Sequence, residues 1–108
     1  MPPEFALQED ALDADRHVVA VRGEIDLFTA PELKQKLTDA IEGGKSRIVV
    51  DLTDTSFLDS TALGVLIASR NAAERRGATL TLANPGPMVS MVLTLTGLFD
   101  TMVAPVPA

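Results

Sequence analysis

The alternation of extended and helical patterns along this chain predicts an α/β domain with a mostly parallel central sheet. The patterns follow the order β-β-α-β-α-β-α, with one more short strand expected near the C-terminus. The apolar run 46–52 has the composition of a strand buried on both faces. The 108 residues show no repeat and suffice for one core, so a single domain 1–108 is expected, with flexible ends at about 1–4 and 104–108.

Two extended segments are expected before the first helix. Phe5 and Leu7 indicate a short edge strand, and the segment 13–15 suits a turn. The β-branched run 17–22 then predicts a strand, and residues 24–28 are expected to form its end and the following loop. These segments supply the first two strands of the predicted order.

The first helix is predicted from a start signal, an apolar period and a stop signal. Thr29 and Glu32 have the spacing of a capping box, and Pro31 lies in the first turn, where its missing N–H costs little. Gly43–Gly44 is expected to end the helix. Between these signals, apolar side chains recur at helical spacing: Ala30, Leu33, Leu37 and Ile41.

The second half of the chain continues the alternation. After the strand at 46–52, the sequence predicts a polar connection, a helix, a strand, a loop, a short helix and a last strand, at 53–56, 60–77, 79–83, 84–87, 88–95 and 102–103. The long helix is expected to face the core with one apolar side, formed by Leu63, Leu66, Ile67 and Ala73.

Composition and charge limit the possible partners. The formal net charge is -6 and the nine Lys and Arg are scattered along the sequence, so direct binding to nucleic acid is not expected. The absence of cysteine excludes disulfides, thiolate metal ligands and thiol catalysis. No apolar stretch approaches the roughly 20 residues that span a membrane, and the N-terminus lacks a signal-peptide pattern. These features predict a soluble, cytoplasmic protein without a membrane partner or a cofactor.

The polar run Asp59-Ser60-Thr61 at the start of a predicted helix is the main candidate site. The free N–H groups and the positive dipole end of a helix N-terminus favour an anion, so this position can bind a phosphate or carry one covalently. Helix capping alone would explain these residue types. It does not explain Gly64 one turn later, because glycine in a helix costs about 0.5–1 kcal/mol relative to alanine. Gly64 indicates that another element or a partner approaches the backbone.

Enzymatic interpretations have weaker support in the sequence. A nucleophile elbow needs glycines on both sides of its serine, but Leu58 and Ala62 occupy those positions around Ser60. The single histidine, His17, lies in a predicted strand, where a structural or exposed role is more common. Residues 43–46 match only the tail of a Walker phosphate loop, and they lie between a helix and a strand instead of the reverse. We therefore expect no enzymatic activity and no catalytic residue.

A magnesium site is a further alternative. Carboxylates at the ends of strands can bind this ion, and Asp51, Asp54, Asp59 and Asp26 are placed near predicted strand ends. Aspartate also prefers turns and helix caps for reasons unrelated to metals. The turn and cap interpretation is favoured, so no metal ligand is assigned.

Two segments resemble the signature of the STAS domain of bacterial anti-sigma-factor antagonists. The first combines Val50-Asp51-Leu52 with residues 57–66, and the second combines Gly23-Glu24-Ile25-Asp26 with residues 29–31 and Leu33. Ala62 departs from the pattern, since the family often carries glycine there. The resemblance covers almost the whole chain, and it implies a small mixed, mostly parallel sheet with helices packed mainly on one side.

The resemblance implies a function in partner switching. In the family, the unphosphorylated antagonist binds an anti-sigma factor that is also a serine/threonine kinase, and a sigma factor is released. The kinase phosphorylates the serine that follows the aspartate of the motif, here Ser60, and a PP2C-type phosphatase reverses the reaction. Ser60 is thus expected to be a phosphorylation site and a substrate position.

The same resemblance implies a partner-binding surface around Ser60, formed by Asp26, Thr29, Asp59, Thr61 and Gly64. Phe28 and Leu27 are either anchors of this surface or a hydrophobic staple for the first helix. An alternative function is a STAS subunit of a lipid-transport or stress-signalling assembly, which docks without a phosphorylation switch. Monomer and weak dimer both remain open.

Overall fold

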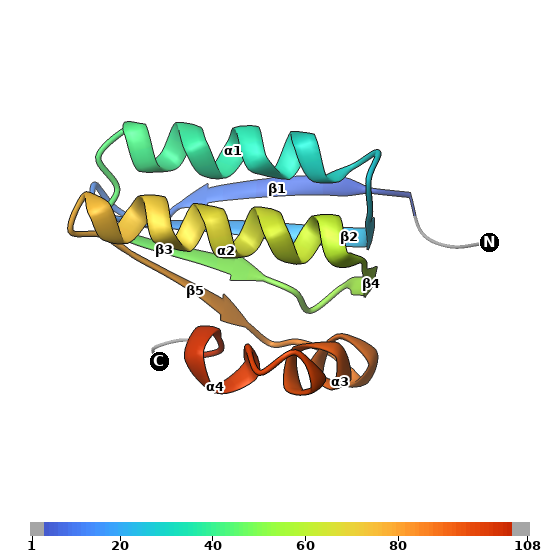
Figure 1. Cartoon of the computed structure of the whole chain (residues 1–108). Helices are drawn as coiled ribbons and strands as arrows, with labels where there is room; N and C mark the ends of the chain where they lie inside the picture. The colour runs from blue at the N-terminus through green and yellow to red at the C-terminus, as the bar shows by residue number, and fades with distance from the viewer. Residues whose placement is uncertain (1–3, 105–108) are drawn as a thin grey trace.

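Within residues 4–104, which the structure describes, the computed structural model contains a five-stranded sheet and four helices (Figure 1). The strands are β1 (Ala6–Ala11), β2 (Arg16–Ile25), β3 (Arg47–Asp51), β4 (Thr55–Leu58) and β5 (Thr79–Ala83). The helices are α1 (Ala30–Glu42), α2 (Ser60–Arg75), α3 (Pro87–Leu95) and α4 (Phe99–Met102). The predicted α/β class is confirmed.

The sheet is mixed and mostly parallel, as the sequence predicts. β1 pairs antiparallel with β2, and β2, β3 and β5 follow as parallel neighbours. Residues 23–25, at the end of β2, pair in parallel with β4. Because β2 has 10 residues and β3 has 5, the end of β2 extends beyond β3 and takes β4 as its neighbour.

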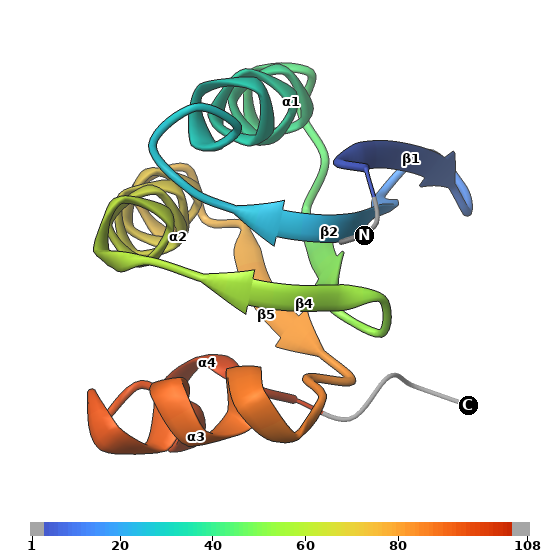
Figure 2. The same ribbon diagram turned by 90° about the vertical axis from the view of Figure 1, so that its right-hand side faces the viewer.

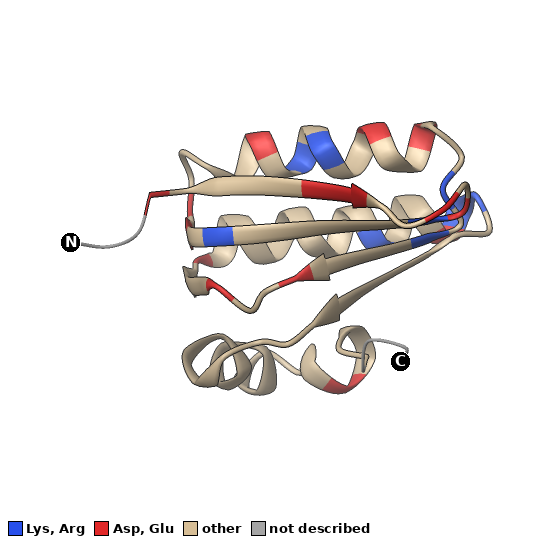
Figure 3. Ribbon diagram, turned by 180° about the vertical axis from the view of Figure 1, so that it is seen from behind, with Lys and Arg blue, Asp and Glu red and all other residues tan. Residues whose placement is uncertain are grey.

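The helices cover one face of the sheet. α1 and α2 lie side by side on that face, and α3 and α4 lie at the edge formed by β4 and β5 (Figure 2). Seen from behind, the strands lie in front of α1 and α2, and no described helix covers them (Figure 3). The expected packing of helices mainly on one side is therefore confirmed.

This one-sided packing corrects the expectation for the strand at 46–52. Ile48 and Val50 of β3 point toward α1 and α2 and are buried. Val49 points to the opposite face, where no described helix lies, and it is only half-buried. β3 is thus covered by helices on one face and not on both.

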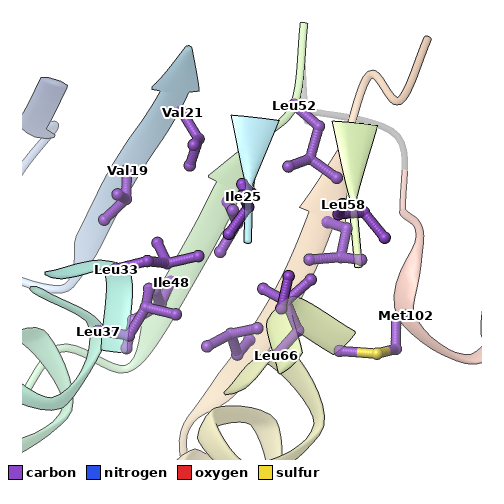
Figure 4. Packing of buried hydrophobic residues seen from close by; sticks show 14 of the residues in the cluster. Val19, Val21, Ile25, Leu33, Leu37, Ile48, Leu52, Leu58, Leu66 and Met102 are labelled. Atoms are coloured by element: carbon purple, nitrogen blue, oxygen red, sulfur yellow. The ribbon is translucent and has the colours of Figure 1, made fainter. Parts of the chain in front are cut away.

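The hydrophobic core lies between the sheet and helices α1 and α2 (Figure 4). Side chains alternate across a strand, so every second residue of a strand faces the helices. Met102 of α4 extends the core to the edge of the sheet, beside Leu58 and Leu66 (Figure 4). The other large side chains that are fully buried include Val19, Val21, Ile25, Leu33, Leu37, Ile48, Leu52, Leu82 and Leu93.

Three elements differ from the sequence-based expectation. The first strand begins at Ala6, one residue after Phe5, and continues to Ala11, so it is longer than predicted. The polar connection predicted at 53–56 contains the start of β4, whose four residues alternate too little to give a strand signal. The last strand predicted at 102–103 is wrong, because residue 102 ends α4 and Val103 makes only a single bridge to β5.

The three longer helices begin and end close to the predicted positions, but the predicted side-chain cap of α1 is not formed. α2 ends at Arg75, two residues before Gly77, and α1 ends at Glu42. Gly44 and Gly77 follow these ends with φ of 85° and 74°, a conformation that glycine adopts without a Cβ penalty. The capping box is wrong: Thr29 is the N-cap residue of α1, but its side chain makes no capping hydrogen bond.

The expected flexible ends fall largely outside the described part of the chain, since residues 1–3 and 105–108 are not included in it. Ala104, assigned to the flexible C-terminal end, donates its N–H to Leu82 O at 3.0 Å and is held against β5. In the part of the chain that is described, no helix is both long and apolar enough to cross a bilayer.

Truncation of a core leucine tests the packing of α2 on the sheet. Leu66→Ala should lower the free energy of unfolding by about 2–5 kcal/mol, because Leu66 is fully buried and its removal leaves a cavity. Urea denaturation followed by circular dichroism measures this loss. Leu12→Ala is the control, since Leu12 is exposed and its truncation should change stability by less than about 0.5 kcal/mol. Equal losses for the two variants would contradict the described core.

Candidate functional site

Two loops meet at one end of the sheet, where β2 and β4 both end. β2 continues through residues 26–29 into α1, and β4 continues through Asp59 into α2. Because β2 and β4 are parallel neighbours, their carboxyl ends lie side by side, and Asp59 N donates to Ile25 O at 3.1 Å. The predicted site residues of the two segments are thereby brought to one surface: Asp26, Phe28, Thr29, Asp59, Ser60 and Thr61.

Asp59 joins the two loops through its carboxylate. Oδ1 accepts a hydrogen bond from Ala62 N at 2.9 Å and so caps α2. Oδ2 accepts a hydrogen bond from Leu27 N at 3.1 Å, across to the β2–α1 loop. The sequence left open whether Asp59 caps the helix or orients the Ser60 hydroxyl. Capping is observed, and the bond to Leu27 is an additional role that the sequence did not indicate.

A second carboxylate shapes the β2–α1 loop. Asp26 Oδ1 accepts hydrogen bonds from Phe28 N at 2.9 Å and from Thr29 N at 3.1 Å. The Thr29 hydroxyl accepts from Asp26 N and donates to Glu24 O, both at 2.9 Å. These bonds hold the loop in one shape, and they occupy the hydroxyl that the predicted capping box would need.

Ser60 carries the accessible hydroxyl of this surface. It is the first residue of α2 and is exposed, and its side chain makes no hydrogen bond to any described residue. The N-terminus of this 16-residue helix favours a negative charge there. Thr61, the neighbouring hydroxyl, is half-buried. Ser60 can therefore accept a phosphate without breaking an existing interaction.

Two exposed apolar side chains lie on the β2–α1 loop, which Asp59 joins to the start of α2. Phe28 is 87% exposed and Leu27 is 62% exposed, on the loop that Asp59 holds. Side chains with this exposure do not pack on α1, so the alternative that they staple the first helix is wrong. An exposed aromatic side chain on a well-ordered loop is typical of a contact surface for another protein.

Gly64 lies on the solvent side of α2, one turn after Ser60. A Cβ placed at Gly64 would meet no atom of the described chain within 4 Å. Close approach by another element of the chain is therefore wrong as an explanation for this glycine. Close approach by a partner stays a prediction.

Three of the four acidic residues considered for a metal site have structural roles instead, and the fourth, Asp54, makes no side-chain hydrogen bond to a described residue. Asp51 Oδ1 accepts hydrogen bonds from Thr53 N at 3.1 Å and from Thr53 Oγ1 at 2.6 Å. Asp26 and Asp59 act in the loop and the cap described above, as the turn and cap interpretation expects. Among residues 4–104, no group of three His, Asp or Glu is arranged to hold a metal ion. His17 lies at the start of β2, at the far end of that strand from the site.

Acidic side chains lie at both ends of the sheet, and basic side chains are more frequent at the end away from Ser60 (Figure 3). Four acidic residues lie at the end that carries Ser60: Glu24, Asp26, Asp54 and Asp59. Five of the nine basic residues lie at the opposite end, together with Asp13 and Asp15: Arg16, Lys45, Arg47, Arg75 and Arg76. A phosphate on Ser60 would thus add charge to an acidic surface.

The protein is an α/β domain with a small mixed sheet and helices on one face. Its candidate site lies at the carboxyl ends of β2 and β4, where an exposed hydroxyl begins the helix after β4. The STAS domain family matches residues 9–107, which is most of the chain. This chain belongs to that family, and the resemblance based on its two motifs is confirmed.

Relatives of this chain in two bacteria are named anti-sigma-B factor antagonists. The relative in Bacillus subtilis (strain 168) is 35% identical over 82 residues, covering 76% of this chain and 74% of the relative. The relative in Staphylococcus aureus (strain NCTC 8325 / PS 47) is 33% identical over 84 residues, covering 78% of each chain. The anti-sigma factor antagonist SpoIIAA, solved in its unphosphorylated form, has the same fold, with a TM-score of 0.83 at 24% identity over 94% of this chain and 89% of SpoIIAA.

Removal of the Asp59 carboxylate should loosen the junction of the two loops. Asp59→Ala should lower the free energy of unfolding by about 0.5–2 kcal/mol through loss of the helix cap. It should also accelerate hydrogen exchange at the Leu27 amide, which loses its acceptor. Asp54→Ala is a matched control, because Asp54 is exposed and its carboxylate is not bonded to a described residue. Unchanged exchange at Leu27 in Asp59→Ala would contradict the link.

Proposed function

We propose that this chain is an anti-sigma factor antagonist that works by partner switching in the cytoplasm. In its unphosphorylated state it binds an anti-sigma factor that is also a serine/threonine kinase, and so releases a sigma factor. Phosphorylation of Ser60 ends this binding, and a PP2C-type phosphatase restores it. The chain is a substrate of these enzymes and not an enzyme itself. The observation that carries this proposal is the exposed Ser60 hydroxyl at the start of α2, which makes no hydrogen bond to a residue in the described range 4–104.

The relatives support this proposal. The two bacterial relatives are named antagonists of an anti-sigma-B factor. SpoIIAA has been solved both unphosphorylated and, from Bacillus, phosphorylated, and the phosphorylated form has a TM-score of 0.76 to this chain. A fold of this kind is thus compatible with both states.

The effect of the phosphate should be local. A phosphate adds about -1.5 to -2 charges and three acceptor oxygens. At Ser60 the helix dipole favours this charge, so the domain itself should tolerate it. The phosphate instead weakens the complex, because its bulk prevents close contact with the partner and its charge repels acidic groups of the partner. A loss of about 2.7 kcal/mol lowers affinity a hundredfold.

The neighbouring residues divide into two roles in this proposal. Phe28 and Leu27 anchor the partner, since both are exposed on a loop that hydrogen bonds hold in place. Asp26, Thr29 and Asp59 position that loop through the hydrogen bonds described above. Two further residues complete the surface on α2: Thr61 beside the phosphate and Gly64, where the absent side chain lets the partner approach the backbone.

Phosphorylation of the purified chain tests the switch. Incubation with the anti-sigma kinase and ATP should add one phosphate to Ser60, because its hydroxyl is the accessible one at the start of α2. Intact mass and phosphosite mapping measure this addition. Ser60→Ala should remain unmodified, and Thr61→Val is the control that should still be phosphorylated.

The outcomes of this experiment separate the candidate functions. The wild type and Ser60→Ala could both bind the kinase tightly and both remain without phosphate. This result would favour the alternative, a docking subunit of a lipid-transport or stress-signalling assembly. Amide chemical-shift changes throughout the sheet of the phosphorylated protein would contradict a local switch.

Truncation of Phe28 tests the apolar anchor. Phe28→Ala should weaken binding to the anti-sigma factor by about tenfold or more, because aromatic anchors carry a large share of interface energy. The midpoint of thermal unfolding should not change, since the Phe28 side chain is exposed. Titration calorimetry measures the affinity, and Leu12→Ala is the control at the opposite end of β2. If the Phe28 and Leu12 variants bind with equal affinity, Phe28 is not part of the partner-binding surface.

A further inference from the structure

The surface helix α3 is apolar on two sides. Residues 84–99 contain no Asp, Glu, Lys or Arg, although the whole chain carries a net charge of -6. Figure 3 accordingly shows α3 without any charged residue. Val89 and Leu93 form its buried side. Its exposed large apolar side chains are Met88, Met91 and Leu95, at 50%, 51% and 78%.

These three exposed side chains form one continuous face. Residues of an α-helix are rotated by about 100° from one to the next, so positions 88, 91 and 95 fall within about 60° of one another. Met91 lies about opposite the midpoint of Val89 and Leu93. We call Met88, Met91 and Leu95 the α3 outer face. The apolar face of a helix is normally buried, whereas this face is open.

The position of α3 connects this face with the candidate site. α3 packs beside β4, and it lies directly below that strand in Figure 2. β4 is followed immediately by Asp59 and Ser60. Phe57 of β4 is itself exposed. A partner that contacts the Ser60 loops and extends past β4 therefore meets α3, whose outer face is turned away from the side that packs on the core.

We propose that the α3 outer face is a second contact area for the anti-sigma factor, an inference that rests on the function proposed above. Interface centres are depleted in charge and enriched in methionine, and this face has two methionines and no charged residue. Methionine side chains adapt readily to the shape of a partner. A stable complex buries about 800 Å² on each partner, which requires more surface than the tips of two loops, and α3 supplies the adjoining area.

A second copy of this chain fits the α3 outer face less well. Two chains with a net charge of -6 repel each other at long range. The face consists of three side chains on a nine-residue helix, and specific interfaces bury about 1,200 Å² or more in total. A larger partner that also contacts the Ser60 loops is not limited to this small area.

Charged substitutions at Leu95 test the proposal. Leu95→Glu and Leu95→Lys are titrated calorimetrically against each purified anti-sigma factor kinase of the source organism. Both variants should bind about tenfold more weakly than the wild type, because a charge of either sign must be desolvated at an apolar contact. Their unfolding midpoints should not change, since Leu95 is exposed. Leu12→Glu, at the β1–β2 turn, is the matched control and should bind within about twofold of the wild type.

Each other outcome overturns the inference. If the wild type binds and both Leu95 variants bind with the same affinity, α3 is not part of the interface. The proposed function is not affected by that result. Weaker binding of Leu95→Glu with stronger binding of Leu95→Lys would indicate a charge effect and no apolar contact. Wild-type dimers in sedimentation that dissociate in Leu95→Glu, with kinase affinity unchanged, would assign the face to a second copy. Absence of wild-type binding to every kinase would overturn both this inference and the proposed function.

Discussion

The site of this STAS domain depends on the unequal length of two neighbouring strands. β2 has 10 residues and β3 has 5, so the last residues of β2 would lack a partner on that side if β4 did not pair with them. Because α2 follows β4 directly, this second pairing places the start of α2 beside the β2–α1 loop. A single carboxylate, that of Asp59, can then bond to the backbone of both segments. The accessible serine next to it is therefore presented by a junction of two elements and not by one mobile loop.

Elements with strong local signals could be predicted from the sequence, and elements that depend on distant contacts could not. α1 was predictable because proline, apolar spacing and glycine all mark it within 16 residues, from 29 to 44. β4 forms because residues 23–25 offer it a hydrogen-bonding edge, which its own four residues do not reveal. Val49 looks like a residue of a fully covered strand, but sequence does not show that both long helices lie on the same face.

The candidate site shows the same division. The run Asp59-Ser60-Thr61 after an apolar pair indicated a helix start, and α2 begins at Ser60. The bond from Leu27 N to Asp59 joins residues 32 positions apart, so no local pattern could predict it. The Thr29 hydroxyl was misassigned because a capping-box spacing is also compatible with bonds back to the preceding loop. The sequence did not show whether the Phe28 side chain is exposed or packs on the first helix, and the structure shows that it is exposed.

The uncharged helix α3 has a consequence for the protein before it meets a partner. An apolar face that is open to water is a place for non-specific association. The net charge of -6, all of it outside residues 84–99, counteracts this by mutual repulsion between copies. Such repulsion extends about 10 Å at 0.1 M salt and about 3 Å at 1 M salt. The colloidal stability of the free protein is thus set by ionic strength, whereas its conformational stability is set by the core.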